Sequence, residues 1–497
     1  MGGIRDISTG DLKQKSVRGA VWTFLGQGGK LALQFVSVVV LARLLTPQDF
    51  GLVGLAGVFI NFLSLFEDLG LTNATIQNRE LTQERTSALF WINTIVAVSL
   101  TAICCACAPL VAGFYEEPRL TMIVVVSSLG ILMTGISNQH AALLQRRLEM
   151  KSLAYREIAG RVCSLGTAVV CALCGMGYWS LVFAGLAGGL SRTVLIWHYS
   201  KWTPSLVSLS HGKQGLRFGL GIAGSNLMNY ISRNTDTMLI GKFHPAAFVG
   251  YYSKAYQMVQ LPIQNVRQPI TSVALSALSK LQDDPVRFRN YYRKIMGVLA
   301  ILSMAPMAFV TAASEECVAV FLGQQWMPSC TTFMILSFGA IIRPTAFATG
   351  LTMIASGRSG HYFLLGLSDA VLLVAVIACT APIGIEAVAL GYTVYGYAMA
   401  VPRMAWACYR THAKWYDFLA MSWRPFLGAM ATLAAGIAAK HCLLQDVASP
   451  LVRLVSLGAI CLAACSLFWL LIPGGRRTML LFKQDTVDIL RKKRQPA

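Results

Sequence analysis

The sequence predicts an all-α integral membrane protein with about fourteen transmembrane helices, and three observations support this fold class. Charged residues make up only 13% of the 497 residues, whereas a soluble domain carries about 25%. Hydrophobic residues make up 55%, and apolar runs long enough to cross a bilayer recur from end to end. Basic residues fall mainly in alternate loops. The membrane is therefore the solvent of nearly every segment.

The apolar runs place the expected spans along the whole chain. The first seven are expected near residues 18–43, 50–72, 88–114, 120–143, 153–175, 178–198 and 215–239. The second seven are expected near residues 247–273, 294–313, 330–356, 362–381, 385–407, 425–442 and 451–472. Each run is about 20 residues long, which is the length that spans the hydrocarbon core.

Loop charge orients the spans. Cation-rich loops, such as the one with Arg146, Arg147 and Lys151, alternate with cation-poor loops such as residues 382–385. An error of one helix would invert every later loop, so the alternation predicts an even number of spans and two cytoplasmic termini. This distribution also accounts for the net charge of +20, so no nucleic-acid partner is expected.

Neither metal, cofactor nor catalytic chemistry is expected. Most of the thirteen cysteines lie inside apolar runs, where a thiol behaves as a small hydrophobe. Cys171 and Cys174 have CxxC spacing but lack a second pair or a nearby histidine. The glycines at 26, 28 and 29 follow no expected strand, which argues against a dinucleotide site.

An internal repeat appears when the chain is shifted by about 199 residues. Corresponding loop residues are Arg43, Pro47, Phe50 and Gly51 in the first copy, and Lys242, Pro245, Phe248 and Gly250 in the second. Six helices separate the copies, so both halves have the same orientation in the membrane. The expected organisation is a tail 1–17, a six-helix bundle 18–198, a linker 199–214, a second bundle 215–407, a helix pair 425–472 and a basic tail 473–497.

Polar side chains form stripes on the expected helices. Polar groups are costly in lipid, so these stripes predict a shared, water-accessible cavity between the halves. The equivalent stripes on the first and seventh spans contain Gln27, Lys30 and Gln34, and Asn226, Asn229, Arg233 and Asp236. The eighth span adds Lys254, Gln257, Gln260, Gln264 and Arg267, and the tenth adds Arg343.

Structural explanations remain open for several of these residues. Lys30 could extend to the membrane interface, and Lys254 and Arg267 could contact headgroups. Arg233 and Asp236 are spaced as an intrahelical ion pair, whereas Asp236 and Asp369 are also candidates for a proton- or cation-coupling acid. A buried acid paired with a cation elsewhere is the more common arrangement.

Two segments carry a family resemblance. Ala42–Gly51 reads ARLLTPQDFG and Leu65–Gln77 reads LFEDLGLTNATIQ, with softer signals in QRRLEM at 145–150 and GYWSLV at 177–182. The chain resembles the polysaccharide transporter family of the MOP flippase superfamily over essentially its whole length.

The resemblance implies a substrate and a mechanism. Members carry undecaprenyl-diphosphate-linked oligosaccharide repeat units from the inner to the outer leaflet for exopolysaccharide, capsule or O-antigen assembly, with no covalent chemistry. Expected partners are this substrate, membrane lipids, and the polysaccharide polymerase and co-polymerase machinery. In relatives with fourteen helices the last pair borders a groove for the lipid tail.

Two other classes of function are weighed against this one. A multidrug or cation antiporter of a related branch would be expected to carry an acid on the first span, where this chain has Lys30. A membrane polysaccharide polymerase or ligase usually has a long periplasmic loop, whereas the outer loops here do not exceed about 20 residues.

Overall fold

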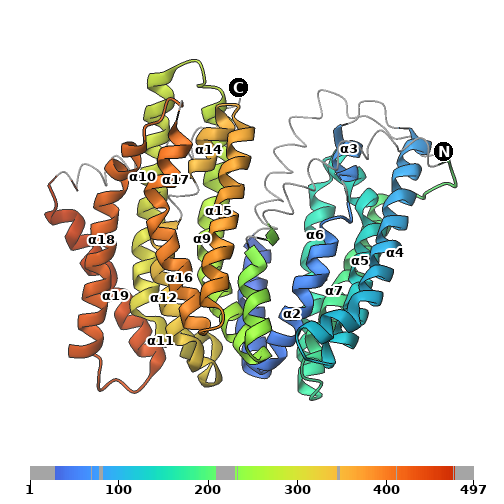
Figure 1. Cartoon of the computed structure of the whole chain (residues 1–497), viewed down its shortest axis with the longest axis horizontal. Coiled ribbons are helices and arrows are strands. Elements are labelled where there is room, and N and C mark those ends of the chain that lie inside the picture. Colours follow the sequence, from blue (N-terminus) through green and yellow to red (C-terminus); the bar gives the residue numbers. More distant parts are fainter. Residues whose placement is uncertain are drawn as a thin grey trace. The chain divides into compact units, whose positions relative to one another are not determined.

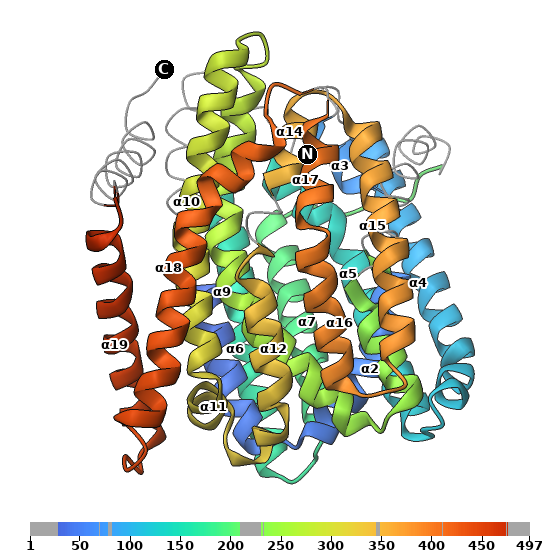
Figure 2. The same cartoon turned by 60° about the vertical axis from the view of Figure 1, so that its left-hand side comes forward.

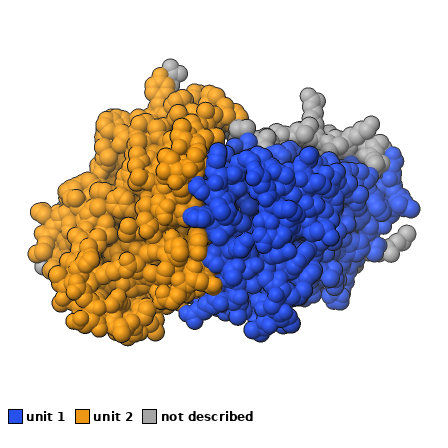
Figure 3. Space-filling model, turned by 60° about the horizontal axis from the view of Figure 1, so that its bottom comes forward, with its two compact units in different colours: residues 1–250 blue, residues 251–497 orange. Residues whose placement is uncertain are grey.

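The computed structural model describes residues 28–68, 70–77, 82–208, 230–231, 233–343, 348–409, 411–473 and 475. Within these ranges the regular secondary structure is entirely helical, as the sequence predicts (Figure 1). Where the expected spans fall on described residues, they coincide with a helix or with a pair of shorter helices. Residues 18–27 of the first expected span and most of the seventh, 215–239, lie outside the described residues. The chain divides into two compact units, residues 1–250 and residues 251–497 (Figure 3). The division expected from the repeat, at residues 199–214, remains a prediction.

Unit 1 contains the helices up to the start of α9. They are a helix over residues 28–44, α2 (Pro47–Ser64), α3 (Leu71–Gln77), α4 (Gln83–Phe114), α5 (Arg119–Arg146), α6 (Met150–Leu173), α7 (Trp179–Ser200) and helical residues 233–243. The helices α4 and α5 pack together, as do α6 and α7.

Unit 2 contains the rest of α9, which crosses the boundary, and the later helices. These are α9 (Ala246–Ser279), α10 (Pro285–Ala312), α11 (Ser314–Cys317), α12 (Cys330–Ala340), α14 (Ala348–Ala355), α15 (Ser359–Thr380), α16 (Ile385–Ala398), α17 (Ala400–Cys408), α18 (Trp415–Cys442) and α19 (Pro450–Leu471). A π-turn at Val318–Leu322 and a 3-10 helix at Gln324–Ser329 connect α11 to α12.

Six of the described helices are long and apolar enough, each by itself, to cross a bilayer. Their spans are Gln83–Phe114, Arg119–Arg146, Trp179–Ser200, Pro285–Ala312, Gly360–Thr380 and Pro450–Leu471. The protein is therefore a multi-pass membrane protein.

Two helices begin well before the apolar run that predicted them. The helices α10 and α18 begin at Pro285 and Trp415, whereas the expected spans begin near residues 294 and 425. Asp417 is buried in the first turn of α18 and accepts hydrogen bonds from Nε and Nη2 of Arg289, both at 2.8 Å. Figure 2 shows the two helices side by side. The polar N-terminal turns of α10 and α18 therefore stabilise each other by this ion pair and by packing. A hydropathy pattern does not predict such turns, because it measures only apolar content.

The second expected span is broken. The helix α2 ends at Ser64, and Gly70 adopts a positive φ of 71° before α3 begins at Leu71. The break follows from the sequence, because Glu67 and Asp68 interrupt the apolar run and glycine tolerates this backbone conformation.

The repeat is visible where α2 meets the first turn of α9 in unit 1. These helices begin at Pro47 and Ala246, which are 199 residues apart. A Cβ placed on Gly51 would lie 1.7 Å from the carbonyl oxygen of Ala246, and a Cβ on Gly250 would lie 1.9 Å from that of Pro47. The contact is reciprocal, and only glycine permits backbones to approach this closely.

Candidate functional site

The first polar stripe lies on the helix over residues 28–44. Lys30 and Gln34 are both half-buried, and Gln27 lies outside the described residues. A Cβ on the neighbouring Gly29 would lie 3.5 Å from Cδ1 of Ile158, so this part of the helix packs against α6. The stripe thus begins beside the residues of α6 that flank Ile158.

Those residues include two arginines whose donors are not all used. Nη2 of Arg156 donates to Oε1 of Glu157 at 3.0 Å, but its Nη1 is buried without a hydrogen-bond partner in the described part of the chain. Nε of Arg161 is likewise buried without a hydrogen-bond partner in the described residues. The side chain of Arg192, on α7, crosses Gly160, where a Cβ would lie 2.5 Å from its Cγ. We call Arg156, Arg161 and Arg192 the α6 arginine cluster.

This cluster was largely missed from the sequence, in which Glu157 and Arg161 merely have the i, i+4 spacing of an intrahelical pair. The hydrogen-bonded partner that the structure gives Glu157 is instead Arg156, the adjacent residue. Spacing along a helix shows which side chains can meet, but tertiary packing decides which of them are buried. A count of cations at the start of the fifth expected span and in the second half of the sixth is the signal that could have found Arg156 and Arg192.

The two described members of the second polar stripe differ in solvent exposure. Arg233 is exposed, whereas Asp236 is only 4% exposed and accepts a hydrogen bond from the backbone N–H of Thr237 at 2.7 Å. The other two members of the stripe, Asn226 and Asn229, lie outside the described residues.

In unit 2, the polar face of α9 runs along the helix as the sequence predicts. Lys254 is only 8% exposed, and its Nζ donates to Oε1 of Gln257, one turn later, at 3.2 Å. Gln260 and Arg267 are half-buried, and Gln264 is exposed. The face therefore changes from buried to partly open along α9.

Arg343 lies against two aromatic rings. Its guanidinium carbon is 4.3 Å from the ring centroid of Tyr392, on α16, and 5.8 Å from that of Tyr256, on α9. Arginine over tyrosine faces is a cation–π arrangement that leaves the N–H groups at the ring edge available to a ligand. We call these three residues the arginine–tyrosine cage. Sequence reasoning found Arg343 but neither tyrosine, because nothing in a single sequence pairs a cation with particular rings.

Asp369 has a cationic partner. Its Oδ1 lies 2.5 Å from Nη2 of Arg403, on α17, and accepts from the hydroxyl of Tyr395 at 2.6 Å. This is the structural arrangement that the sequence left open beside a coupling role. The carboxylate is neutralised locally, and a coupling role for Asp369 remains a prediction.

Comparison with known proteins places this geometry in a family. Residues 40–331, more than half of the chain, match a family described as polysaccharide biosynthesis protein. The lipopolysaccharide biosynthesis protein WzxC of Escherichia coli is 23% identical and covers 86% of this chain and 88% of its own length. The succinoglycan biosynthesis transport protein ExoT of Rhizobium meliloti is 25% identical and covers 83% of this chain and 84% of its own.

Solved structures show the same fold. The lipid II flippase MurJ in an inward closed conformation superposes with a TM-score of 0.70 at 12% identity, covering 91% of this chain and 98% of its own. An inward-facing multidrug resistance MATE transporter of the MOP superfamily has a TM-score of 0.62 at 15% identity, covering 77% of this chain and 94% of its own. The chain thus has the MOP superfamily fold and belongs to the polysaccharide biosynthesis protein family.

Proposed function

We propose that the protein is a flippase that moves undecaprenyl-diphosphate-linked oligosaccharide from the inner to the outer leaflet by alternating access. The observation that carries the proposal is the α6 arginine cluster. Arg156 and Arg161 each have a buried donor with no hydrogen-bond partner in the described part of the chain, so an anion that enters this region would satisfy them.

The local charge balance favours a diphosphate. Four cations, namely Lys30, Arg156, Arg161 and Arg192, stand against the single carboxylate of Glu157 in this part of unit 1. A lipid diphosphate loses hydration when it leaves the leaflet surface, and charge-assisted hydrogen bonds from arginine offset that loss. The same arrangement is unfavourable for the cationic drugs of an antiporter.

The oligosaccharide needs different chemistry, and unit 2 offers it. Sugars present hydroxyl groups together with apolar ring faces, which suit amide side chains and aromatic rings. Gln257 and Gln260 supply amides, and the arginine–tyrosine cage supplies ring faces beside N–H donors. The relatives named for lipopolysaccharide and succinoglycan synthesis support this class of substrate.

The direction of transport requires an orientation, and we propose that both termini are cytoplasmic in a bacterial inner membrane. On this orientation Glu116, between α4 and α5, is periplasmic and Lys151, at the start of α6, is cytoplasmic. Cysteines placed there in a cysteine-free background should react with an impermeant maleimide from outside at position 116 only. Labelling of position 151 instead would reverse the proposed direction.

The direct experiment measures which leaflet holds lipid-linked oligosaccharide in cells that lack the protein. Enzymatic access from the periplasmic face should find the intermediates protected on the cytoplasmic leaflet, together with loss of surface polymer. Restoring the chain on a plasmid should reverse both effects. Unpolymerised intermediates on the outer leaflet would instead indicate a step after flipping, such as polymerisation or ligation.

A further inference from the structure

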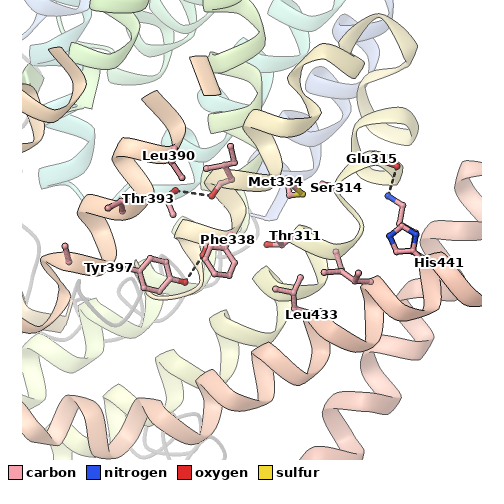
Figure 4. Close-up of a pocket in the computed structure, with 16 residues that line it drawn as sticks. Thr311, Ser314, Glu315, Met334, Phe338, Leu390, Thr393, Tyr397, Leu433 and His441 are labelled. Atoms are coloured by element: carbon pink, nitrogen blue, oxygen red, sulfur yellow. Dashed lines mark hydrogen bonds and ion pairs between the residues drawn. The ribbon is translucent and has the colours of Figure 1, made fainter. Parts of the chain in front are cut away.

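A deep cavity lies within unit 2, between α10, α12, α16 and α18. It is open on one side and has a volume of about 970 Å³, at the upper end of the range of about 300–1,000 Å³ for small-molecule sites. Figure 4 shows side chains from these four helices around it. The walls are mostly apolar, with Met334, Phe338, Leu390, Leu433 and Ile437 among the lining residues.

Three hydroxyl groups that line the cavity already donate hydrogen bonds to backbone carbonyl groups. The hydroxyl of Thr311 donates to the carbonyl oxygen of Met307 at 2.8 Å, and that of Tyr397 donates to Phe338 at 3.0 Å. The hydroxyl of Thr393 donates to the carbonyl oxygen of Ile335 at 3.0 Å. With these hydrogens committed to the backbone, the interior offers hydrocarbon contact and little else, which excludes a sugar as its natural occupant.

The mouth of the cavity is charged. Nζ of Lys440 lies 2.5 Å from Oε2 of Glu315 and 3.7 Å from Oε1 of Glu316. Glu316 is only 3% exposed, and its Oε2 has no hydrogen-bond partner in the described part of the chain. The ammonium of Lys440 thus lies between two carboxylates, of which Glu315 lines the cavity and Glu316 is buried behind it, so the mouth can hold a further cation beside Glu315 and an anion beside Lys440.

The cavity extends over most of one membrane leaflet. Its mouth lies where α10 and α18 end, at Ala312 and Cys442. Its lining residues run from Leu390 to Ala398 on α16 and from Leu433 to His441 on α18, which corresponds to about 12 Å along each helix. Half of the hydrocarbon core is about 15 Å thick, so the charged groups at the mouth lie near headgroup level.

We propose that this cavity binds a phospholipid with an ethanolamine headgroup, drawn from the leaflet that faces the end of α18. An acyl chain fills the apolar interior, the phosphate lies beside Lys440, and the ammonium lies beside Glu315, with the buried Glu316 adding negative charge behind it. An anionic phospholipid is disfavoured because it would place its charge at a mouth with two carboxylates and one ammonium. This site is separate from the α6 arginine cluster and does not rest on the proposed flipping of oligosaccharide.

Native mass spectrometry of the full chain tests the proposal. The protein is reconstituted in nanodiscs with equal amounts of phosphatidylethanolamine, phosphatidylglycerol and phosphatidylcholine, then released and weighed. One phosphatidylethanolamine should remain bound, about threefold or more enriched over the other two lipids. Retention of no lipid, or preferential retention of phosphatidylglycerol, would overturn the assignment.

Two tryptophan variants of α18 locate the lipid. Leu433→Trp fills the cavity and should reduce the retained lipid about tenfold, whereas Leu427→Trp lies on the same helix outside the cavity and should not. Ile437→Trp provides a second filling variant if Leu433→Trp does not fold. Equal retention by the filling and control variants would place the lipid elsewhere.

A headgroup variant separates charge recognition from chain burial. In Glu315→Gln combined with Glu316→Gln, the mouth keeps Lys440 alone, so the preference should change from phosphatidylethanolamine to phosphatidylglycerol while total occupancy persists. An unchanged preference would remove the proposed role of the carboxylates. Adding polyprenyl diphosphate to the nanodiscs should leave the retained lipid unchanged, and its displacement by the polyprenyl lipid would instead assign the cavity to the transported substrate.

Discussion

The two units differ in the partners that they give to arginine side chains inside the protein. In unit 1, the α6 arginine cluster has buried donors without protein partners, and Glu157 is its one bonded carboxylate in the described residues. In unit 2, Arg343 lies over two tyrosine rings and Arg403 is paired with Asp369. The first arrangement is unfavourable without an anion, whereas the second is satisfied within the protein.

This difference assigns separate tasks to the units. Guanidinium groups with unused buried donors favour a ligand that brings negative charge, such as a diphosphate. Guanidinium groups that already lie against tyrosine rings or a carboxylate depend less on an anionic ligand, which suits a sugar chain of varied composition. Each of the following experiments changes one side of this comparison.

The largest effect is expected in unit 1. Arg161→Ala should lower polymer export at least tenfold, because a lost charge-assisted hydrogen bond costs about 1.5–3 kcal/mol. Export is measured in a strain that lacks the protein, at matched amounts in the membrane. Lys30→Ala should behave similarly, and the exposed Arg119→Ala, whose partner is the loop residue Glu117, serves as the control. Normal export by Arg161→Ala would place the anion elsewhere.

In unit 2 the expected effect depends on the ring and not on a charge. Tyr392→Leu removes one face of the arginine–tyrosine cage and should lower export about 2- to 30-fold, as a cation–π contact contributes about 0.5–2 kcal/mol. Tyr392→Phe keeps the ring and should retain nearly full export. Both variants are assayed as for Arg161→Ala. If Tyr392→Phe exports no more polymer than Tyr392→Leu, the contact between the ring and Arg343 does not contribute to transport.

Asp369→Asn should affect stability more than transport. It leaves Arg403, which is largely buried, without its carboxylate, so the melting temperature in detergent should fall by several degrees. Export per correctly folded molecule should stay within about twofold of the unmodified protein. The exposed Asp283→Asn serves as the control. A selective loss of transport with unchanged melting would instead favour a coupling role.

The smallest effect concerns pH and the turn between α4 and α5. Hydrogen bonds from Arg119 hold the pKa of Glu117 below its usual value of 4.5. A lowered pKa in the folded state means that the stabilisation is present at neutral pH and is lost as pH falls through the folded value. Glu117→Gln should therefore lower the melting temperature slightly at pH 7 and have no effect once the pH is below the pKa that Glu117 has in the folded protein. The pair is on the surface, so the contribution should not exceed about 1 kcal/mol.

The sequence predicts the fold well because hydropathy and loop charge report directly on the membrane. It also predicts the starts of α2 and α9, which the 199-residue shift relates. It does not predict the early starts of α10 and α18, because Asp417 and Arg289 stabilise those turns across two helices. Hydropathy measures one segment at a time and cannot detect such a pair.

For the candidate site, the sequence identifies polar residues inside spans but not their partners. Lys254 and Arg343 were found because a charge within an apolar run is conspicuous. Tyr256 and Tyr392 were missed because tyrosine is common in spans, and only the packed structure shows which rings face a guanidinium. Arg156 was missed because it lies near the start of α6, where a cation is expected to face headgroups, and Arg192 was missed because only the packed structure shows that its side chain crosses Gly160.

The reciprocal contact at Gly51 and Gly250 also bears on the origin of the chain. Each glycine meets the backbone of the residue that begins the other's helix, so residue i contacts j and the equivalent of j contacts the equivalent of i. This is the isologous pattern of a two-fold symmetric dimer. It is the contact that two copies of a half-length ancestor would make, and the gene duplication that joined them would have inherited this contact already formed.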